Sequence, residues 1–508
     1  MKRFWVTISI LFACALLFFV GSGVILALAP GTDIFGVSYV SAWVGKNTVE
    51  DSWNDLINGD ITIETRTIPV VINFEPYTKT SVVFKQNYSG YTTDTERVPN
   101  ATIERNASGV TVKTSEVNKF AIGRNTADSN LTITLPLVWA NGTHSIYIKS
   151  DSSVVTINAR EESIVKLNTL SVDVNSSVNF KCKLNATNLV LNSRNKTTLT
   201  EDLRAENIDY TTNAGDLIID YDCDGTVNFK SNSASLKFKS IRNLVAETKS
   251  GSILPNGETN TVVSKASVET KRGKVNIDYL PSTLYTSEIK TNTGAVNIKL
   301  ARNVKITAPK ARVNVESIYN GEIAGGSRQV TVGSVSGELT VSSTVGKIIV
   351  GGLDDAKKVK AVNATSTRGR IEIYNTSGKV VINTNSGDVY LVNNSSNDIT
   401  IEGAKNVIAL GLMGAVNVKA TRTISLSFDK FTNDVSVVCE KNCKRINIAI
   451  PKKLSELKLN LSSTGKKGIV NIYEGDELTK SEQTIEQDGT VGLTVSATKC
   501  PVNIYLDK

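Results

Sequence analysis

Residues 365–391 read TSTRGRIEIYNTSGKVVINTNSGDVYL, and one short phrase occurs in them three times. Each copy has a glycine, at Gly369, Gly378 and Gly387, followed by apolar residues at alternate positions, so that a glycine recurs every nine residues. Alternation at period two places the apolar side chains on one face of a strand. Glycine accepts the backbone angles of the corner that precedes each strand.

The phrase recurs along much of the chain, and other spacings are close to two such steps. One strand cannot bury its apolar face alone, whereas stacked copies can, so the short period predicts an all-β, parallel β-solenoid (β-helix-like) fold with these apolar residues inside. An antiparallel sandwich with glycine turns is the alternative, but the loops lack room for Greek-key crossings. Further copies begin at Gly215, Gly225, Gly273, Gly294, Gly337, Gly346 and Gly414.

The composition is that of a folding chain rather than a disordered one. Of 508 residues, 40% are hydrophobic and 21% are charged, and the net charge is only +8. Lys and Arg are spread among Asp and Glu without a long basic block. Nucleic-acid binding needs a concentrated basic patch with interleaved aromatic residues, so we expect no nucleic-acid partner and a mixed-charge surface.

The N-terminus carries an uncharged apolar segment. Residues 4–29 contain no charged residue, and a bilayer is crossed by ~20 residues, whereas a secretory apolar core is shorter. Pro30 follows Ala27-Leu28-Ala29 and is expected to block cleavage there. The basic Met1-Lys2-Arg3 start retains the N-terminus in the cytoplasm. We therefore predict one N-terminal transmembrane helix as an uncleaved membrane anchor, a single-pass topology and an extracellular ectodomain. Cleavage, or lipidation at Cys14, is the alternative.

The regularity of the strand pattern divides the chain. Around Pro69 and Pro76 the turns are less regular, and proline suggests edge strands. Solenoids need atypical end units that cover their open cores. The predicted divisions are an anchor (1–29), a juxtamembrane linker (30–59), a β-rich cap or entry domain (60–165), β-solenoid repeats (166–430), and C-terminal β repeats with a cap (431–508).

A longer unit also repeats, with the order strand, Leu/Ile-Pro, short loop, strand, Ser/Thr-rich corner, strand. It begins at Leu131, Leu280 and Ile446. This unit, with its Ser/Thr-Gly-x-Val-x-Ile corner, resembles the putative-adhesin family of bacterial β-strand-repeat surface proteins over roughly residues 130–475. The resemblance implies stacked strands in a solenoid, often behind a membrane segment, and an adhesive role. It assigns no functional residues.

Five cysteines lie outside the apolar segment, and an external compartment permits disulfides. Cys439 and Cys443 could close a tight loop, and Cys182 could bond Cys223 across neighbouring coils, which would leave Cys500 alone. Free buried thiols are the alternative. Zinc is disfavoured because no C-x-x-C spacing and no His cluster supports it.

One stretch matches the first half of a calcium-binding loop. In Asp220-Tyr-Asp222-Cys-Asp224-Gly225 the carboxylates could converge on a hard cation, with Gly225 allowing the sharp turn. The twelfth position is Ser231, where that loop uses Glu. Alternating Asp on the outward face of a strand would give the same letters. Calcium is the one cofactor that the sequence suggests.

No catalytic motif is present, and Asp354-Asp355 is the only Asp-Asp pair in the repeat region. We therefore expect a non-catalytic, membrane-anchored, adhesin-like cell-surface protein that binds a surface glycan or protein, or scaffolds, through a long solenoid face. A carbohydrate-active β-solenoid enzyme of the lyase or glycosidase type is one alternative, because carboxylates distant in sequence can meet in space. A surface stalk or sensor scaffold is another.

Overall fold

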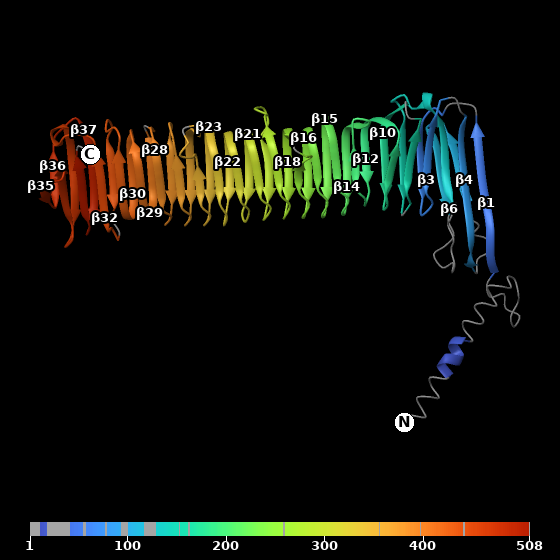
Figure 1. Ribbon diagram of the computed structural model, residues 1–508, viewed down its shortest axis with the longest axis horizontal. Helices are drawn as coiled ribbons and strands as arrows, with labels where there is room; N and C mark the ends of the chain where they lie inside the picture. Colours follow the sequence, from blue (N-terminus) through green and yellow to red (C-terminus); the bar gives the residue numbers. More distant parts are fainter. Residues whose placement is uncertain are drawn as a thin grey trace. The chain divides into compact units, whose positions relative to one another are not determined.

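The structure is a computed structural model in which the chain forms two compact units, unit 1 (Met1–Gly215) and unit 2 (Asp216–Lys508). Both are built from β-strands, mostly parallel (Figure 1). The described residues are 11–17, 41–53, 57–76, 79–92, 100–115, 129–151, 153–160, 163–257, 260–354, 356–396, 398–439 and 442–506.

Most of the predicted anchor and much of the linker after it lie outside the described residues. Within residues 4–29 the structure describes one short helix at 11–17. Among the described residues, no helix has both the length and the apolar character needed to cross a bilayer. The transmembrane helix therefore stays a prediction.

Unit 1 contains two sheets. The first has the order β1-β4-β7-β3-β9-β11, and the second runs β5-β6-β2-β8-β10-β12-β14. Pairing is parallel from β7 to β11 and from β6 to β14, but β1, β4 and β5 pair antiparallel. The antiparallel strands end the stack of coils, as the open end of a solenoid requires. The strands are β1 (Ser41–Trp53), β2 (Asp60–Thr65), β3 (Val70–Glu75), β4 (Thr80–Thr92), β5 (Asn100–Asn106), β6 (Gly109–Ser115), β7 (Asn130–Pro136), β8 (Ser145–Ser150), β9 (Val155–Ala159), β10 (Ile164–Val174), β11 (Val178–Lys181), β12 (Lys183–Asn192), β13 (Thr197–Leu199) and β14 (Leu203–Thr212).

Unit 2 is a regular parallel solenoid in which each coil crosses two sheets. Sheet I includes β19, which contains Val275, and sheet II includes β20, which contains Ile289. Long strands such as β21 and β22 turn a corner and belong to both sheets. The strands are β15 (Leu217–Ser231), β16 (Leu236–Thr248), β17 (Ile253–Pro255), β18 (Val262–Thr270), β19 (Val275–Leu280), β20 (Ser287–Thr291), β21 (Val296–Ala308), β22 (Val313–Gly325), β23 (Val330–Ser343), β24 (Ile348–Val350), β25 (Val359–Ser366), β26 (Ile371–Tyr374), β27 (Val380–Thr384), β28 (Val389–Asn394), β29 (Asp398–Leu412), β30 (Ala415–Phe428), β31 (Val435–Cys439), β32 (Arg445–Ile450), β33 (Leu457–Thr464), β34 (Ile469–Glu474), β35 (Glu477–Glu482), β36 (Thr484–Gln487), β37 (Val491–Thr498) and β38 (Pro501–Leu506).

The core of unit 2 consists of apolar ladders between the two sheets. On sheet I, Val296 pairs with Val313 and Val313 with Val330, and their side chains are fully buried. On sheet II, Val362, Val380 and Ile399 form a similar ladder. The alternating apolar residues predicted from the sequence are buried throughout this unit, which confirms the solenoid and its inward face.

The nine-residue spacing of the glycines corresponds to half a coil. The corner glycines are needed for a different structural reason from the one predicted. Gly369 and Gly387 are not among the glycines with positive φ, so the expectation of special backbone angles was wrong. Instead, a Cβ on Gly369 would lie 2.1 Å from the carbonyl oxygen of Gly346, one coil away. Glycine is needed because neighbouring coils approach at backbone contact.

The Ser or Thr three residues before each corner glycine has a hydrogen-bonding role. The buried Ser366 Oγ accepts a 2.8 Å bond from the Gly369 N–H, and Thr384 Oγ1 does the same for Gly387. These hydroxyls satisfy amide groups that would otherwise be buried without a partner. The bonds explain the Ser/Thr-x-x-Gly pattern of the repeats.

At the C-terminal end the order of the coils in space differs from their order in the chain. The final strands, β37 and β38, pair with β31 and β32 on one side and with β33 and β34 on the other. The last coil in space is therefore β33 and β34, which pair antiparallel with β36 and β35. These antiparallel strands, one of them the largely exposed ELTKSE of β35, close the solenoid against edge-to-edge association.

Val380→Asp is expected to destabilise unit 2 by about 3 kcal/mol or more, because the carboxylate would enter a dry apolar ladder without a partner. Val381→Asp on the outward side of the same strand is the matched control, with an expected change below about 1 kcal/mol. Denaturant unfolding followed by circular dichroism measures both. Equal midpoints for the two variants would contradict the inward assignment.

Candidate functional site

The outward face of sheet II carries polar rows that run from strand to strand. Asn417 on β30 is in register with Ser436 on β31, and the row continues through Thr494 on β37 to Asn460 on β33. Sequence alone could not align these residues, because β37 enters between β31 and β33 from a later part of the chain. Their amide and hydroxyl groups offer both donors and acceptors to a ligand.

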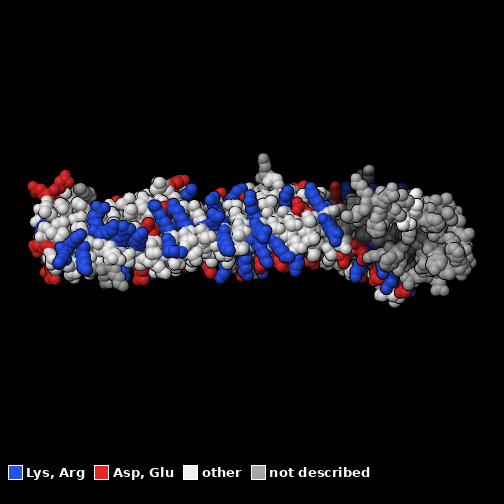
Figure 2. Space-filling model, turned by 90° about the horizontal axis from the view of Figure 1, so that it is seen from below, with Lys and Arg blue, Asp and Glu red and all other residues white. Residues whose placement is uncertain are grey.

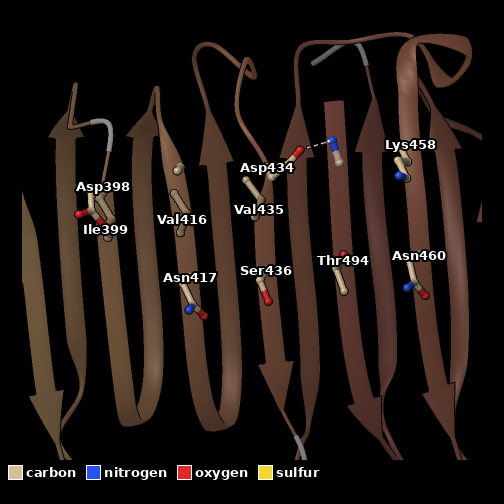
Figure 3. Close-up of a pocket in the computed structure, with 12 residues that line it drawn as sticks. Asp398, Ile399, Val416, Asn417, Asp434, Val435, Ser436, Lys458, Asn460 and Thr494 are labelled. Atoms are coloured by element: carbon tan, nitrogen blue, oxygen red, sulfur yellow. Dashed lines mark hydrogen bonds between the residues drawn. The ribbon is translucent and has the colours of Figure 1, made fainter. Parts of the chain in front are cut away.

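A hollow of about 420 Å³ lies beside this row (Figure 3). Small residues create it: Ala415 and Gly492 occupy outward positions where neighbouring strands carry longer side chains. Asp398, Asp434 and Lys458 line the same side. The hollow therefore combines charged groups with hydroxyls and amides, a surface suited to hydrogen bonding.

The two carboxylates of the hollow already have partners. Asp398 forms a 3.1 Å ion pair with the Lys379 ammonium, and Asp434 Oδ1 accepts a 2.8 Å bond from the Gly492 N–H. Their strands, β29 and β31, both pair with β30, which separates the two positions by about 10 Å. Glycosidases bring two carboxyl groups to about 5–9.5 Å from each other across a scissile bond, whereas each of these carboxylates is held by a contact of its own.

A second, larger hollow of about 810 Å³ lies on the same sheet face over β20 to β25. Glu288, Lys305 and Glu322 follow one another in register along it. Lys305 Nζ lies 2.8 Å from Glu322 Oε2, and this hydrogen bond raises the pKa of Lys305. The alternating charges neutralise each other, so this part of the face is polar without a strong net charge.

The predicted calcium ligands lie apart from both hollows and do not converge. Asp222 and Asp224 point outward from β15 and are exposed. Asp220 pairs instead with Lys239 at 2.9 Å, and this bond lowers the pKa of its carboxyl. In the described part of the chain no three His, Cys, Asp or Glu side chains are grouped closely enough to hold a metal. The arrangement matches alternating Asp on an outward face.

The disulfide pairing differs from the one predicted. Cys443 bonds Cys500, which the sequence reading left unpaired, with 5.5 Å between their Cα atoms. The predicted Cys439–Cys443 bond is wrong, because Cys439 points into the core at the end of β31. Cys443 and Cys500 instead precede β32 and β38, which pair in parallel, so their corners are adjacent.

The other cysteines near the repeats are thiols rather than disulfides, as the alternative interpretation of the sequence held. Cys182 and Cys223, which were predicted to bond each other, form no disulfide. Burial raises the pKa of the Cys182 and Cys439 thiols to about 11 in each case, and also raises that of Cys223. Thiols with such high pKa values are mostly protonated and unreactive at neutral pH. Of the Asp354-Asp355 pair, only Asp354 lies within the described residues.

Comparison with known proteins identifies the family. The family model described as Toastrack DUF4097 matches residues 58–342, more than half of the chain, and the chain belongs to this family. This match confirms the family resemblance predicted from the repeats.

Two solved structures are also similar to the chain. One is a putative adhesin from Parabacteroides distasonis, with 12% identity, a TM-score of 0.19, and coverage of 67% of this chain and 97% of that one. The other is a putative adhesin from Parabacteroides merdae, with 13% identity, a TM-score of 0.16, and coverage of 68% and 95%. No curated protein matches the chain.

Peptide mapping of the unreduced protein is expected to recover a peptide pair linked through Cys443 and Cys500. Cys443→Ser should lower the free energy of unfolding by about 2–4 kcal/mol, because the bond restricts a long loop in the unfolded chain. Cys182→Ala, which removes a free thiol, is the control for the mapping. Recovery of Cys439 linked to Cys443 would refute the assignment.

Proposed function

We propose that this protein is a non-catalytic, adhesin-like cell-surface protein that binds its ligand through the outward face of sheet II. The observation that carries the proposal is the polar row Asn417–Ser436–Thr494–Asn460 beside a shallow hollow. Affinity would be distributed over many hydrogen bonds along the solenoid. Surface glycans, which present many hydroxyl groups, fit such a face, and surface proteins are the second ligand class.

A carbohydrate-active enzyme is the second candidate, and the Asp398–Asp434 pair in the hollow is the observation that favours testing it. Two features count against catalysis. Asp398 is held by the Lys379 ammonium, and Asp434 is held by the Gly492 N–H. Asp398 is also exposed to solvent beside the Lys379 ammonium rather than enclosed in an apolar site.

The membrane anchor and extracellular location belong to the same proposal. The uncharged segment 4–29 followed by Pro30 supports an uncleaved anchor. The Cys443–Cys500 disulfide supports an oxidising compartment outside the cytoplasm.

To test the binding face, the full chain in mild detergent is incubated with a panel of surface glycans and matrix proteins. For a ligand that binds, Asn417→Ala with Asn460→Ala should weaken affinity about tenfold, because two outward hydrogen bonds are lost. Asn297→Ala with Asn314→Ala, on the outward face of sheet I, is the matched control and should bind normally.

The same incubations are analysed for released products. Turnover of a glycan that disappears in Asp398→Asn or Asp434→Asn would replace the adhesin reading with the enzymatic one. Equal loss of binding in the sheet I and sheet II variants would instead show that the sheet II face is not the site.

Mass spectrometry of the mature N-terminus tests the anchor. We expect a chain that retains residues 4–29 and partitions with membranes. A start at Pro30 or Gly31 would show secretion, and a lipidated Cys14 would show a lipoprotein; either result contradicts the transmembrane anchor.

A further inference from the structure

One edge of unit 2 is strongly basic although the sequence shows no basic block. The edge consists of the corners that follow each sheet II strand and precede the next sheet I strand. Over nine consecutive corners these segments contain eleven Lys or Arg residues and one acidic residue, Asp388. The segments are 249–252, 271–274, 292–295, 309–312, 326–329, 344–347, 367–370, 385–388 and 403–406. We call this surface the basic edge.

The basic edge is a continuous line rather than a set of separate charges. Successive corners are joined by backbone hydrogen bonds, such as Arg272 N–H to Lys249 O at 2.9 Å and Thr293 N–H to Lys271 O at 3.0 Å. Each corner is therefore displaced by about one strand spacing, 4.7–4.9 Å, along the solenoid axis. Figure 2 shows the resulting row of Lys and Arg side chains along one side of this unit.

Most of these cations are not neutralised. Lys347 and Arg370 share the carboxylate of Glu372, at 2.8 Å and 2.7 Å. Among the described residues, the other nine cations have no carboxylate within 4 Å. The side chains of these nine are exposed. The nine are Lys249, Lys271, Arg272, Lys274, Lys310, Arg312, Arg328, Arg368 and Lys405.

The opposite corners of the same coils are a useful contrast. They carry both signs, with Glu338 and Asp354 as well as Arg302 and Lys358. Lys379, at another of them, is neutralised by Asp398. The expectation of a mixed-charge surface therefore holds for the opposite corners but fails for the basic edge. On the basic edge, stacking of the coils brings together Lys and Arg residues that are distant in sequence.

We propose that the basic edge binds a linear acidic polysaccharide, one with carboxylate or sulfate groups at regular intervals, that lies along the solenoid axis. The spacing of the cations along the basic edge is similar to the spacing of anionic groups in a polysaccharide that carries one such group on each sugar ring. Ser, Thr and Asn side chains between the cations, such as Ser250, Asn292 and Thr367, supply partners for sugar hydroxyls.

The same corners favour a polysaccharide over single-stranded nucleic acid. None of the nine segments contains an aromatic residue. Binding of single strands relies on bases that stack on aromatic side chains. Duplex DNA and anionic bilayers present other arrays of negative charge, and both are included in the test.

This inference does not depend on the sheet II hollow. The basic edge uses the corners, whereas the proposed adhesive face uses the outward rows of a sheet, so variants of one surface leave the other intact. Because the attraction is between exposed charges, affinity at the basic edge should fall steeply with ionic strength. Binding through neutral hydrogen bonds in the hollow should depend on salt much less.

The probe is polygalacturonate, with neutral dextran as the ligand control, titrated into the full chain in uncharged detergent. The test variant is Lys271→Gln with Arg272→Gln and Lys274→Gln, all in one exposed corner. The matched control is Arg302→Gln with Lys357→Gln and Lys358→Gln, which removes the same charge from exposed residues at opposite corners. Thermal unfolding of each variant verifies that it folds.

We expect polygalacturonate, but not dextran, to bind at low salt. Binding should be about tenfold weaker for the 271–274 variant and less than about twofold weaker for the control variant. Equal weakening by the two variants would overturn the proposal, because it would reflect net charge alone. Absence of polygalacturonate binding, or clearly tighter binding of duplex DNA or of phosphatidylglycerol vesicles through residues 271–274, would also overturn it. Loss of glycan binding by the sheet II variants alone would leave this result unaffected.

Discussion

The close approach of neighbouring coils at their corners is the constraint on which the rest of unit 2 depends. At Gly273 a Cβ would lie 1.7 Å from the carbonyl oxygen of Gly251, and at Gly294 it would lie 1.8 Å from that of Gly273. Only residues without a side chain permit this contact where it recurs, and the buried hydroxyl of Thr270 completes it by accepting the Gly273 N–H. The contact sets the register, and the register aligns the apolar ladders that form the core.

Stacking in register also converts single positions of the repeat into long surface rows. A residue that occurs once per coil contributes to a line of like groups about 4.8 Å apart. Outward positions of sheet II become the polar row, and corner positions become the basic edge. Glu372 illustrates how the environment differs from position to position within a row. Most outward carboxylates are exposed, but this one is buried to 5% exposure between Lys347 and Arg370.

The ends of the chain follow the same physical logic. A parallel stack leaves unpaired backbone groups on its terminal strand. Antiparallel strands cover such an edge within each unit, β1 and β4 in unit 1 and β35 and β36 in unit 2. In unit 2 the chain then returns to insert β37 and β38 one coil inward. The Cys443–Cys500 bond joins that inserted coil to its neighbour. A covalent link therefore fixes the inserted coil at the place where the order of the coils in space differs from their order in the sequence.

The sequence by itself determined the class of fold and the inward face. Alternation at period two and the recurring glycines depend on local geometry and on burial, both of which can be read along the chain. The hollow beside Asp434 and the pairing of Cys443 could not be read in this way, since each joins segments more than fifty residues apart through the inserted coil. The reason for the corner glycines was also hidden, because the group that excludes a side chain belongs to another coil. Only the tertiary structure collects scattered lysines and arginines on one edge, because net charge and spacing along a chain contain no information about which corners will stack.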